Sequence, residues 1–257
     1  GGFSMSGGGA DLNYTDDELD SYETIWDGEV TSTKKSDHKR VVTALKNISE
    51  GNDLETYMDI DNLLRYMAVH VFSVNEDSLS GMMAHNYYLY ESGGKLNLIP
   101  WDYNLALGGM GGSSDATSVV NDAIDNAFSG TNFFDTLMED ETYHSQYYTY
   151  LQQLVSEYID GGGFDAFYER VRSQIDELVK TDPTAFYSYD EYLTAADTLY
   201  QVVKLRGQSI QGQLDGSIPS TEEAQRSSDA LVDASTLDIS VMGSMNTGGG
   251  GGGFGFN

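Results

Sequence analysis

Residues 75–104 constrain the fold of this chain more than any other segment. They read NEDSLSGMMAHNYYLYESGGKLNLIPWDYN, in which residues 86–91 are rich in tyrosine and residues 96–99 are aliphatic, with a glycine turn between the two runs. Such a pattern predicts a β-hairpin. Asp77 precedes the hairpin and Asp102 follows it. Because the two open ends of a hairpin lie side by side, we expect these two carboxylates to come close together.

Both acids stand where a charge needs a partner. Apolar residues at helical spacing predict a helix over residues 59–74, and its C-terminal end delivers Asn75 and Asp77. That end is the negative pole of the helix dipole, so an acid there indicates a nearby metal or hydrogen-bonding network, or else an ordinary polar loop. Asp102 stands between two large aromatic residues, so we expect it to be partly buried and either paired or metal-bound.

Helical periodicity covers much of the remaining chain. A helix is predicted over residues 36–49, and further helices run from about 117 to 215, with apolar stripes expected in the core. The glycine-rich residues 108–117 predict a mobile loop. The resulting fold class is α+β, mainly α, with the hairpin carrying the site loops. We divide the chain into a flexible entry, a folded domain and a polar, glycine-rich tail, at residues 1–10, 11–215 and 216–257.

The charge balance narrows the possible partners. The chain has 257 residues, with 41 acidic and 13 basic side chains and a formal charge of −28. Such a charge repels phosphate backbones and anionic membranes, so nucleic-acid binding is not expected, and it favours divalent cations. There is no cysteine, which excludes disulfides and thiolate metal sites. No apolar run approaches the roughly 18 residues of a membrane span.

Several familiar chemistries are missing from the sequence. It contains no phosphate-binding G-x-x-x-x-G-K-[ST] motif, no G-x-S-x-G elbow and no H-E-x-x-H zinc motif. The four histidines lack metal-ligand spacing, and only His85 lies within residues 75–104. What remains is carboxylate and asparagine chemistry centred on Asp77, Asn86 and Asp102.

The same residues resemble a known family. The runs HNYYLYE from His85 and LIPWDYN from Leu98, together with NEDS from Asn75, closely resemble the spore-coat protein H (CotH) family of atypical kinases. The segments ADLNY and LLRYMAVHVF are similar to its secreted clostridial members. The resemblance runs from about residue 10 to 215, and it implies the C-terminal lobe of a protein-kinase-like fold.

The resemblance also implies an activity and a set of roles. Family members transfer phosphate from ATP, with Mg²⁺ or another divalent cation, to serine residues of spore-coat or extracellular proteins. Asp77 matches the catalytic aspartate of the family. Asp102 matches the metal-binding aspartate of its PWD motif. From the chemistry of Mg²⁺, which needs few carboxylates beside phosphate oxygens and water, we add the amides of Asn86 and Asn104 as metal ligands.

Three neighbouring residues are expected around the nucleotide or behind the metal ligands. Trp101 packs under the metal-binding loop or lies near the adenine. His85 is the histidine best placed to take part. Asn75 opens the motif that contains Asp77.

Two departures from the family pattern bear on activity. Asn104 replaces an acid that many relatives carry two residues after the PWD aspartate. The family's N-terminal lobe, with its RGNS-type segment and phosphate-contacting lysine, has no counterpart here, because no lysine or arginine before the hairpin lies in a convincing strand. The chain therefore reads as a C-terminal lobe cut near the hinge, and we expect weak or no ATP binding by this fragment alone.

Two other classes of function stay open. One is a non-catalytic structural protein of the cell surface or spore coat, which fits the acidic composition and the glycine-rich tail. The other is a carboxylate hydrolase that uses Asp77 and Asp102 as acid and base at a glycosidic bond, and it requires an aromatic-lined cleft. The family resemblance places the protein outside the bacterial cell, at its surface or in the spore coat.

Overall fold

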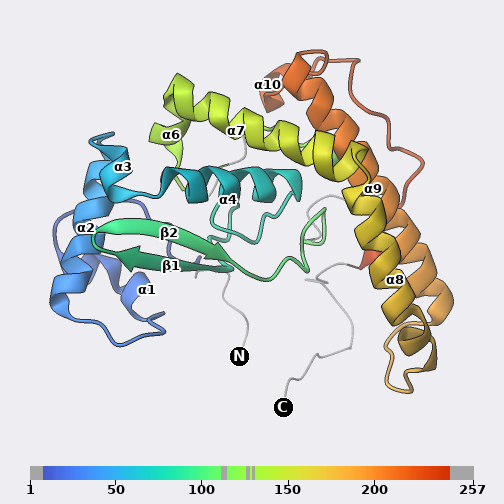
Figure 1. The fold of residues 1–257 in the computed structure, drawn as a ribbon, viewed down its shortest axis with the longest axis horizontal. Coiled ribbons are helices and arrows are strands. Elements are labelled where there is room, and N and C mark those ends of the chain that lie inside the picture. Colours follow the sequence, from blue (N-terminus) through green and yellow to red (C-terminus); the bar gives the residue numbers. More distant parts are fainter. Residues whose placement is uncertain (1–7, 111–114, 126–127, 129–130, 244–257) are drawn as a thin grey trace.

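The structure is a computed structural model that describes residues 8–110, 115–125, 128 and 131–243. Figure 1 shows a two-stranded hairpin beneath the helix α4, with α7 above that helix and the long pair α8 and α9 to one side. The predicted class, α+β and mainly helical, is confirmed, because the described residues form one two-stranded sheet among many helices.

The first layer of helices precedes the hairpin and supports the predicted site. It consists of two short turns and three helices: η1 (Leu19–Tyr22), α1 (Glu23–Trp26), α2 (Lys35–Ser49), α3 (Leu54–Tyr57) and α4 (Ile60–Phe72). The predicted helices at 36–49 and 59–74 are both confirmed. The backbone N–H of Lys34 donates to the Asp37 carboxylate at 2.8 Å and so fixes the start of α2. Asp59 caps α4 by accepting from the backbone N–H of Asn62.

The predicted hairpin is present as β1 (Tyr87–Ser92) and β2 (Lys95–Pro100), paired antiparallel with Tyr87 opposite Pro100. Gly93 and Gly94 form the turn at φ angles of 65° and 92°, which suit glycine. The amide of Asn62 fastens α4 to β2, because it donates to the carbonyl of Leu98 at 3.0 Å and accepts from the N–H of the same residue at 2.8 Å.

The main core lies between the hairpin, α2, α4 and a second layer of helices. That layer consists of α6 (Asp135–Glu139), α7 (Glu141–Gln153) and the π-helical continuation η2 (Leu154–Asp160). The fully buried residues of this main core include Leu64, Leu98 and Tyr147. Burial of this kind stabilises by about 25 cal/mol per Å² of apolar surface removed from water, so this core holds the hairpin and α4 in one body.

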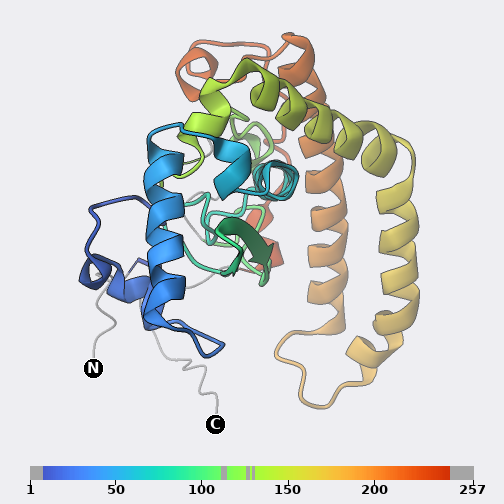
Figure 2. The same cartoon turned by 60° about the vertical axis from the view of Figure 1, so that its left-hand side comes forward.

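A second, smaller core lies along α9. Figure 2 shows α8 (Gly163–Thr181) and α9 (Tyr189–Asp215) running side by side as a long pair whose connecting loop projects from the body. The expectation that the apolar stripe of α8 is core is wrong for much of its length. Phe164 is the one buried residue of α8, whereas Phe167 is 45% and Leu178 66% exposed. The helix packs against η2 and α9, and these two neighbours leave Phe167 and Leu178 exposed.

The remaining elements close the second core. They are α5 (Ala116–Val120), α10 (Glu222–Gln225) and η3 (Ile239–Met242). Residues 217–243 were assigned from the sequence to a polar tail, and in the structure Ala234 and Ile239 are buried in this core. The glycine-rich end of the chain, residues 1–7 and residues 111–114 of the predicted mobile loop lie outside the described residues.

Candidate functional site

The candidate site begins at the C-terminal end of α4, where carbonyl groups lack helical partners. Arg206 of α9 is fully buried there, and its guanidinium donates to the carbonyl oxygens of Val71 at 2.7 Å and Phe72 at 3.3 Å. It also donates to Asp122 O at 2.6 Å and Val120 O at 3.2 Å. The sequence predicts a metal or a hydrogen-bonding network at this negative helix end. The structure has the cationic side chain of Arg206 there, within a hydrogen-bonding network.

The loop after α4 is held by its own polar groups. Asn75 N donates to the carbonyl of His70 at 3.1 Å, and the Ser78 hydroxyl donates to the carbonyl of Asn75 at 2.6 Å. Leu79 N donates to the Tyr66 hydroxyl at 3.1 Å, which ties the loop back to α4. Together these bonds fix the backbone on both sides of Asp77.

Asp77 lies at the centre of this loop with its side chain 16% exposed. The imidazole of His85 lies beside it, with Nδ1 3.5 Å from Asp77 Oδ1. The amide of Asn86 donates to the backbone carbonyl of Asp77 at 2.8 Å. Asp77 is thus held in place beside two of the other predicted site residues, His85 and Asn86.

Asn86 also joins the two ends of the hairpin. Its carbonyl accepts from the N–H of Trp101 at 3.0 Å, directly beyond the last strand pair. A continuous path of two hydrogen bonds therefore runs from the Asp77 backbone through Asn86 to the residue before Asp102. The structure brings the two predicted acidic loops together at the open end of the hairpin.

Asp102 itself differs from its expectation. We expected this carboxylate to be partly buried between aromatic residues, but the residue is exposed. The reason is its backbone, which has a φ of 53° and turns the chain sharply at the end of β2. Its Oδ1 accepts a long hydrogen bond from the N–H of Asn104 at 3.4 Å, and Asn104 is exposed as well.

Backbone strain concentrates around these two loops. Seven non-glycine residues of the described chain have a positive φ, and five of them lie within residues 74–107. These five are Val74, Ala84, Asn86, Asp102 and Leu107. Each such residue costs on the order of 1–3 kcal/mol and persists where the surrounding structure overdetermines it, a condition that occurs often at functional sites.

Tyr103 and His70 connect the second loop to α4. The two rings lie with centroids 5.2 Å apart, and His70 stacks on Tyr66 at 3.9 Å on its other side. Burial lowers the pKa of His70 to about 4, against a smaller opposing effect of its bond to the Tyr66 carbonyl, so the ring is neutral at pH 7. Leu107 N donates to the carbonyl of Ser73 at 2.8 Å and fastens the same loop further along.

The outer face of the hairpin is aromatic and open. Tyr88 stacks on Trp101 at 5.8 Å between centroids, and the two side chains belong to residues that are 48% and 44% exposed. Tyr90 and Ile99 continue the face at 55% and 49% exposure. This surface adjoins the loop that carries Asp102, so a flat apolar group could lie on it beside the carboxylate.

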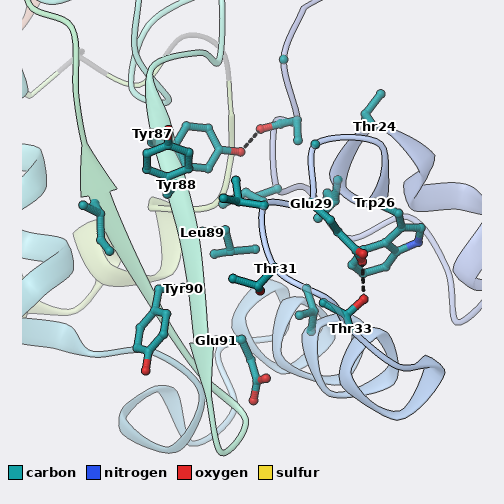
Figure 3. Close-up of a pocket in the computed structure, with 18 of the residues that line it drawn as sticks. Thr24, Trp26, Glu29, Thr31, Thr33, Tyr87, Tyr88, Leu89, Tyr90 and Glu91 are labelled. Atoms are coloured by element: carbon teal, nitrogen blue, oxygen red, sulfur yellow. Dashed lines mark hydrogen bonds between the residues drawn. The ribbon is translucent and has the colours of Figure 1, made fainter.

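A large pocket opens along the edge of β1. Its volume is about 810 Å³, and Figure 3 shows Leu89 and Glu91 of β1 facing the segment that carries Glu29 and Thr33. Its lining includes His85, Asn86 and Trp101, but neither of the two aspartates. A pocket of this size is within the range of small-molecule sites.

Sequence reasoning missed two contributors. Arg206 gave no local signal, because its partners are 84 to 135 residues away, although an arginine on an apolar helix face is unusual enough to notice. Tyr88 belongs to a tyrosine-rich strand, and strand alternation would have placed it on the face opposite Tyr87.

The donor set fits a cation that keeps most of its water. Within the described residues, no three Asp, Glu or His side chains are close enough to hold a metal ion by themselves. Mg²⁺ does not require such a cage, because one or two carboxylates suffice when phosphate oxygens and water complete the shell. The exposed Asp102 supplies one such carboxylate, while the amide nitrogen of Asn86 is bonded to the Asp77 carbonyl.

Comparison with known proteins gives one match. The sequence model of the family described as CotH kinase protein matches residues 5–210. A search of curated proteins finds no match to the chain. Among its described residues, no helix combines the length and the apolar character that crossing a membrane requires.

Proposed function

Because this chain belongs to the CotH kinase protein family, we propose that it forms the C-terminal lobe of a phosphotransferase that moves phosphate from ATP to serine residues of proteins. The observation that carries the proposal is the hydrogen-bonded path from the Asp77 backbone through Asn86 to Trp101, which joins two carboxylate loops at one end of the hairpin.

Each residue has a role that follows from its surroundings. Asp77, held in a fixed loop beside His85, orients the serine hydroxyl and accepts its proton. Asp102, with the amide oxygens of Asn86 and Asn104, holds a divalent cation. ATP with its cation supplies the phosphoryl group and neutralises its charge.

The nucleotide base is proposed to bind an aromatic surface of the hairpin. The stacked pair of Tyr88 and Trp101 presents an open aromatic face next to Asp102, and an adenine lying there would point its phosphates toward the carboxylate. Of the two positions expected for Trp101, this supports the one near the adenine. The adjoining pocket of about 810 Å³ leaves room for the rest of the nucleotide.

The substrates are proposed to be proteins outside the bacterial cell, at its surface or in the spore coat. This part of the proposal is supported by the family to which the chain belongs.

The test is transfer of labelled phosphate from ATP to serine by the natural protein that carries this sequence, since we expect the 257-residue chain alone to bind ATP weakly. Asp77→Asn should lower the rate by about 10²–10⁴, the range typical of a lost general base. Glu223→Gln, which removes an exposed acid elsewhere, is the control. Unchanged transfer in Asp77→Asn, or no transfer by the wild-type protein, overturns the proposal and leaves a structural role.

A further inference from the structure

A second, polar cavity lies behind the loop that carries Asp77. Its volume is about 220 Å³, and its lining comes from four places: the end of α4, residues 74–81, the segment after α5, and α10. Of the residues expected above around the metal or the nucleotide, Asn75 lines it, whereas Asp102 and the other proposed metal ligands, Asn86 and Asn104, do not.

Two nearly inaccessible side chains at this cavity have unpaired polar atoms. His70 is 1% and Asn75 4% exposed, and both line the cavity. His70 Nε2 and both polar atoms of the Asn75 amide have no hydrogen-bond partner. Buried polar atoms in native proteins are nearly always paired, so this set indicates that the cavity holds water or another hydrogen-bonding ligand.

The unpaired histidine nitrogen is an acceptor. His70 Nδ1 lies 2.7 Å from the carbonyl oxygen of Tyr66, which can only accept, so the ring proton is on Nδ1. The neutral ring therefore has its lone pair on Nε2. The missing ligand, or the water that surrounds it, must donate hydrogen bonds at this position.

Three carboxylates from three segments surround the same space. They belong to Glu76, Asp122 and Glu222. Burial raises the pKa of Asp122, and the charges of Glu76 and Glu222 raise it further against the lowering effect of Arg206. Arg206 forms only a long ion pair with this carboxylate, with Nη2 3.8 Å from Asp122 Oδ2, while its shorter hydrogen bonds go to backbone carbonyls.

The size of the cavity indicates the form of the ligand. A volume of about 220 Å³ is large enough for a cation that keeps its shell of water. In the described residues no three acidic or histidine side chains approach closely enough for direct coordination. Mg²⁺ loses its water reluctantly and is often held through that water.

We propose that this cavity binds a hydrated divalent cation of the Mg²⁺ type, held by Asp122, Glu76 and Glu222 and by hydrogen bonds from its water to His70 and Asn75. The ion joins the loop before Asp77 to the segment after α5 and to α10. This site is separate from the proposed metal at Asp102, and it does not depend on the proposed phosphotransfer.

The experiment is Mn²⁺ binding, with MnCl₂ as the probe, by calorimetry and water-proton relaxation in 150 mM NaCl buffer, a concentration near the physiological value that screens exposed charges. The full chain is compared with Asp122→Asn/Glu222→Gln and with Asp102→Asn. Two controls are matched: Glu223→Gln removes the same charge next to the site, and Arg226→Gln breaks the 3.2 Å ion pair of Glu222 without changing a cavity acid.

We expect Asp102→Asn and both controls to retain the cavity ion, and the double variant to lose at least tenfold in Mn²⁺ affinity while keeping its metal-free unfolding midpoint. Equal affinity in the double variant and the controls overturns the inference, as does a cavity that holds water only. If Mn²⁺ binding disappears in Asp102→Asn alone, the inference fails while the proposed function stands.

Discussion

The two acidic loops at the open end of the hairpin are built in opposite ways. Asp77 is 16% exposed, lies beside His85 and stands in a loop fixed by several hydrogen bonds. Asp102 is exposed, and its carboxylate accepts a long hydrogen bond from Asn104 N at 3.4 Å. One carboxylate is positioned by the protein, and the other faces solvent.

This difference matches the two roles proposed. A group that orients a hydroxyl must be in place before the reaction, because misplacement by 1 Å can cost about a hundredfold in rate. A carboxylate that binds a hydrated cation gains its position from the ion, and it costs less desolvation when it starts in water. Variants that affect one loop and leave the other intact test this difference.

The largest effect is expected at Arg206, which anchors the helix end before Asp77. Arg206→Met removes four hydrogen bonds to backbone carbonyls, of which those of Val71 and Asp122 keep another donor, so we expect a loss of about 3–5 kcal/mol in the free energy of unfolding. Urea denaturation measures it. Arg206→Lys keeps the positive charge but lacks the planar guanidinium, so its free energy of unfolding should lie between those of wild type and Arg206→Met. A loss below about 1 kcal/mol in Arg206→Met would show that the anchor is unimportant.

The next effect concerns pH and His70, which contacts both loops through Tyr66 and Tyr103. Its pKa is lowered to about 4 in the folded protein. The unfolded chain therefore takes up the proton first as pH falls. The neutral ring makes its full contribution to the free energy of unfolding above about pH 6.5. As pH falls toward 4, this contribution is lost, by about 3 kcal/mol in total.

Stability measured at several pH values tests this effect. His70→Gln should flatten the fall in unfolding free energy between pH 6.5 and 4. The same slope in His70→Gln and wild type contradicts the buried, neutral state.

Asn86 tests the connection between the loops. Asn86→Ala removes the amide bond to the Asp77 carbonyl and places alanine at a φ of 56°, for a combined cost of about 2–3 kcal/mol. Asn86→Gly is the matched control, since glycine tolerates this φ and loses only the hydrogen bond. Thermal unfolding should rank wild type above glycine and glycine above alanine, and an alanine variant as stable as wild type refutes the connection.

The smallest effect on stability is expected at Asp102. Because this side chain faces solvent, Asp102→Asn should change the free energy of unfolding by less than about 0.5 kcal/mol in the absence of metal. Chemical denaturation of the metal-free chain measures it. A loss of 2 kcal/mol or more would mean that Asp102 has a structural partner, and the contrast with the Asp77 loop would disappear.

The parts predicted correctly from sequence are those with local causes. The hairpin follows from strand propensity and the Gly93–Gly94 turn, and α4 follows from its periodicity. The exposure of Asp102 was mispredicted, because one φ angle outweighed its aromatic neighbours. The exposed stripe of α8 and the anchoring role of Arg206 depend on which segments meet in space, which local pattern does not encode. The roles of Asp77, Asp102 and their neighbours stay predictions.

The measurement that tests the central claim most directly compares Asp77→Asn and Asp102→Asn in the natural protein for Mg²⁺-dependent ATP affinity and for phosphate transfer to serine. The account predicts that Asp77→Asn keeps the affinity and loses transfer, while Asp102→Asn loses the Mg²⁺-dependent part of the affinity together with transfer. Equal behaviour of the two variants, with affinity retained in both, would contradict the division of roles between the two loops.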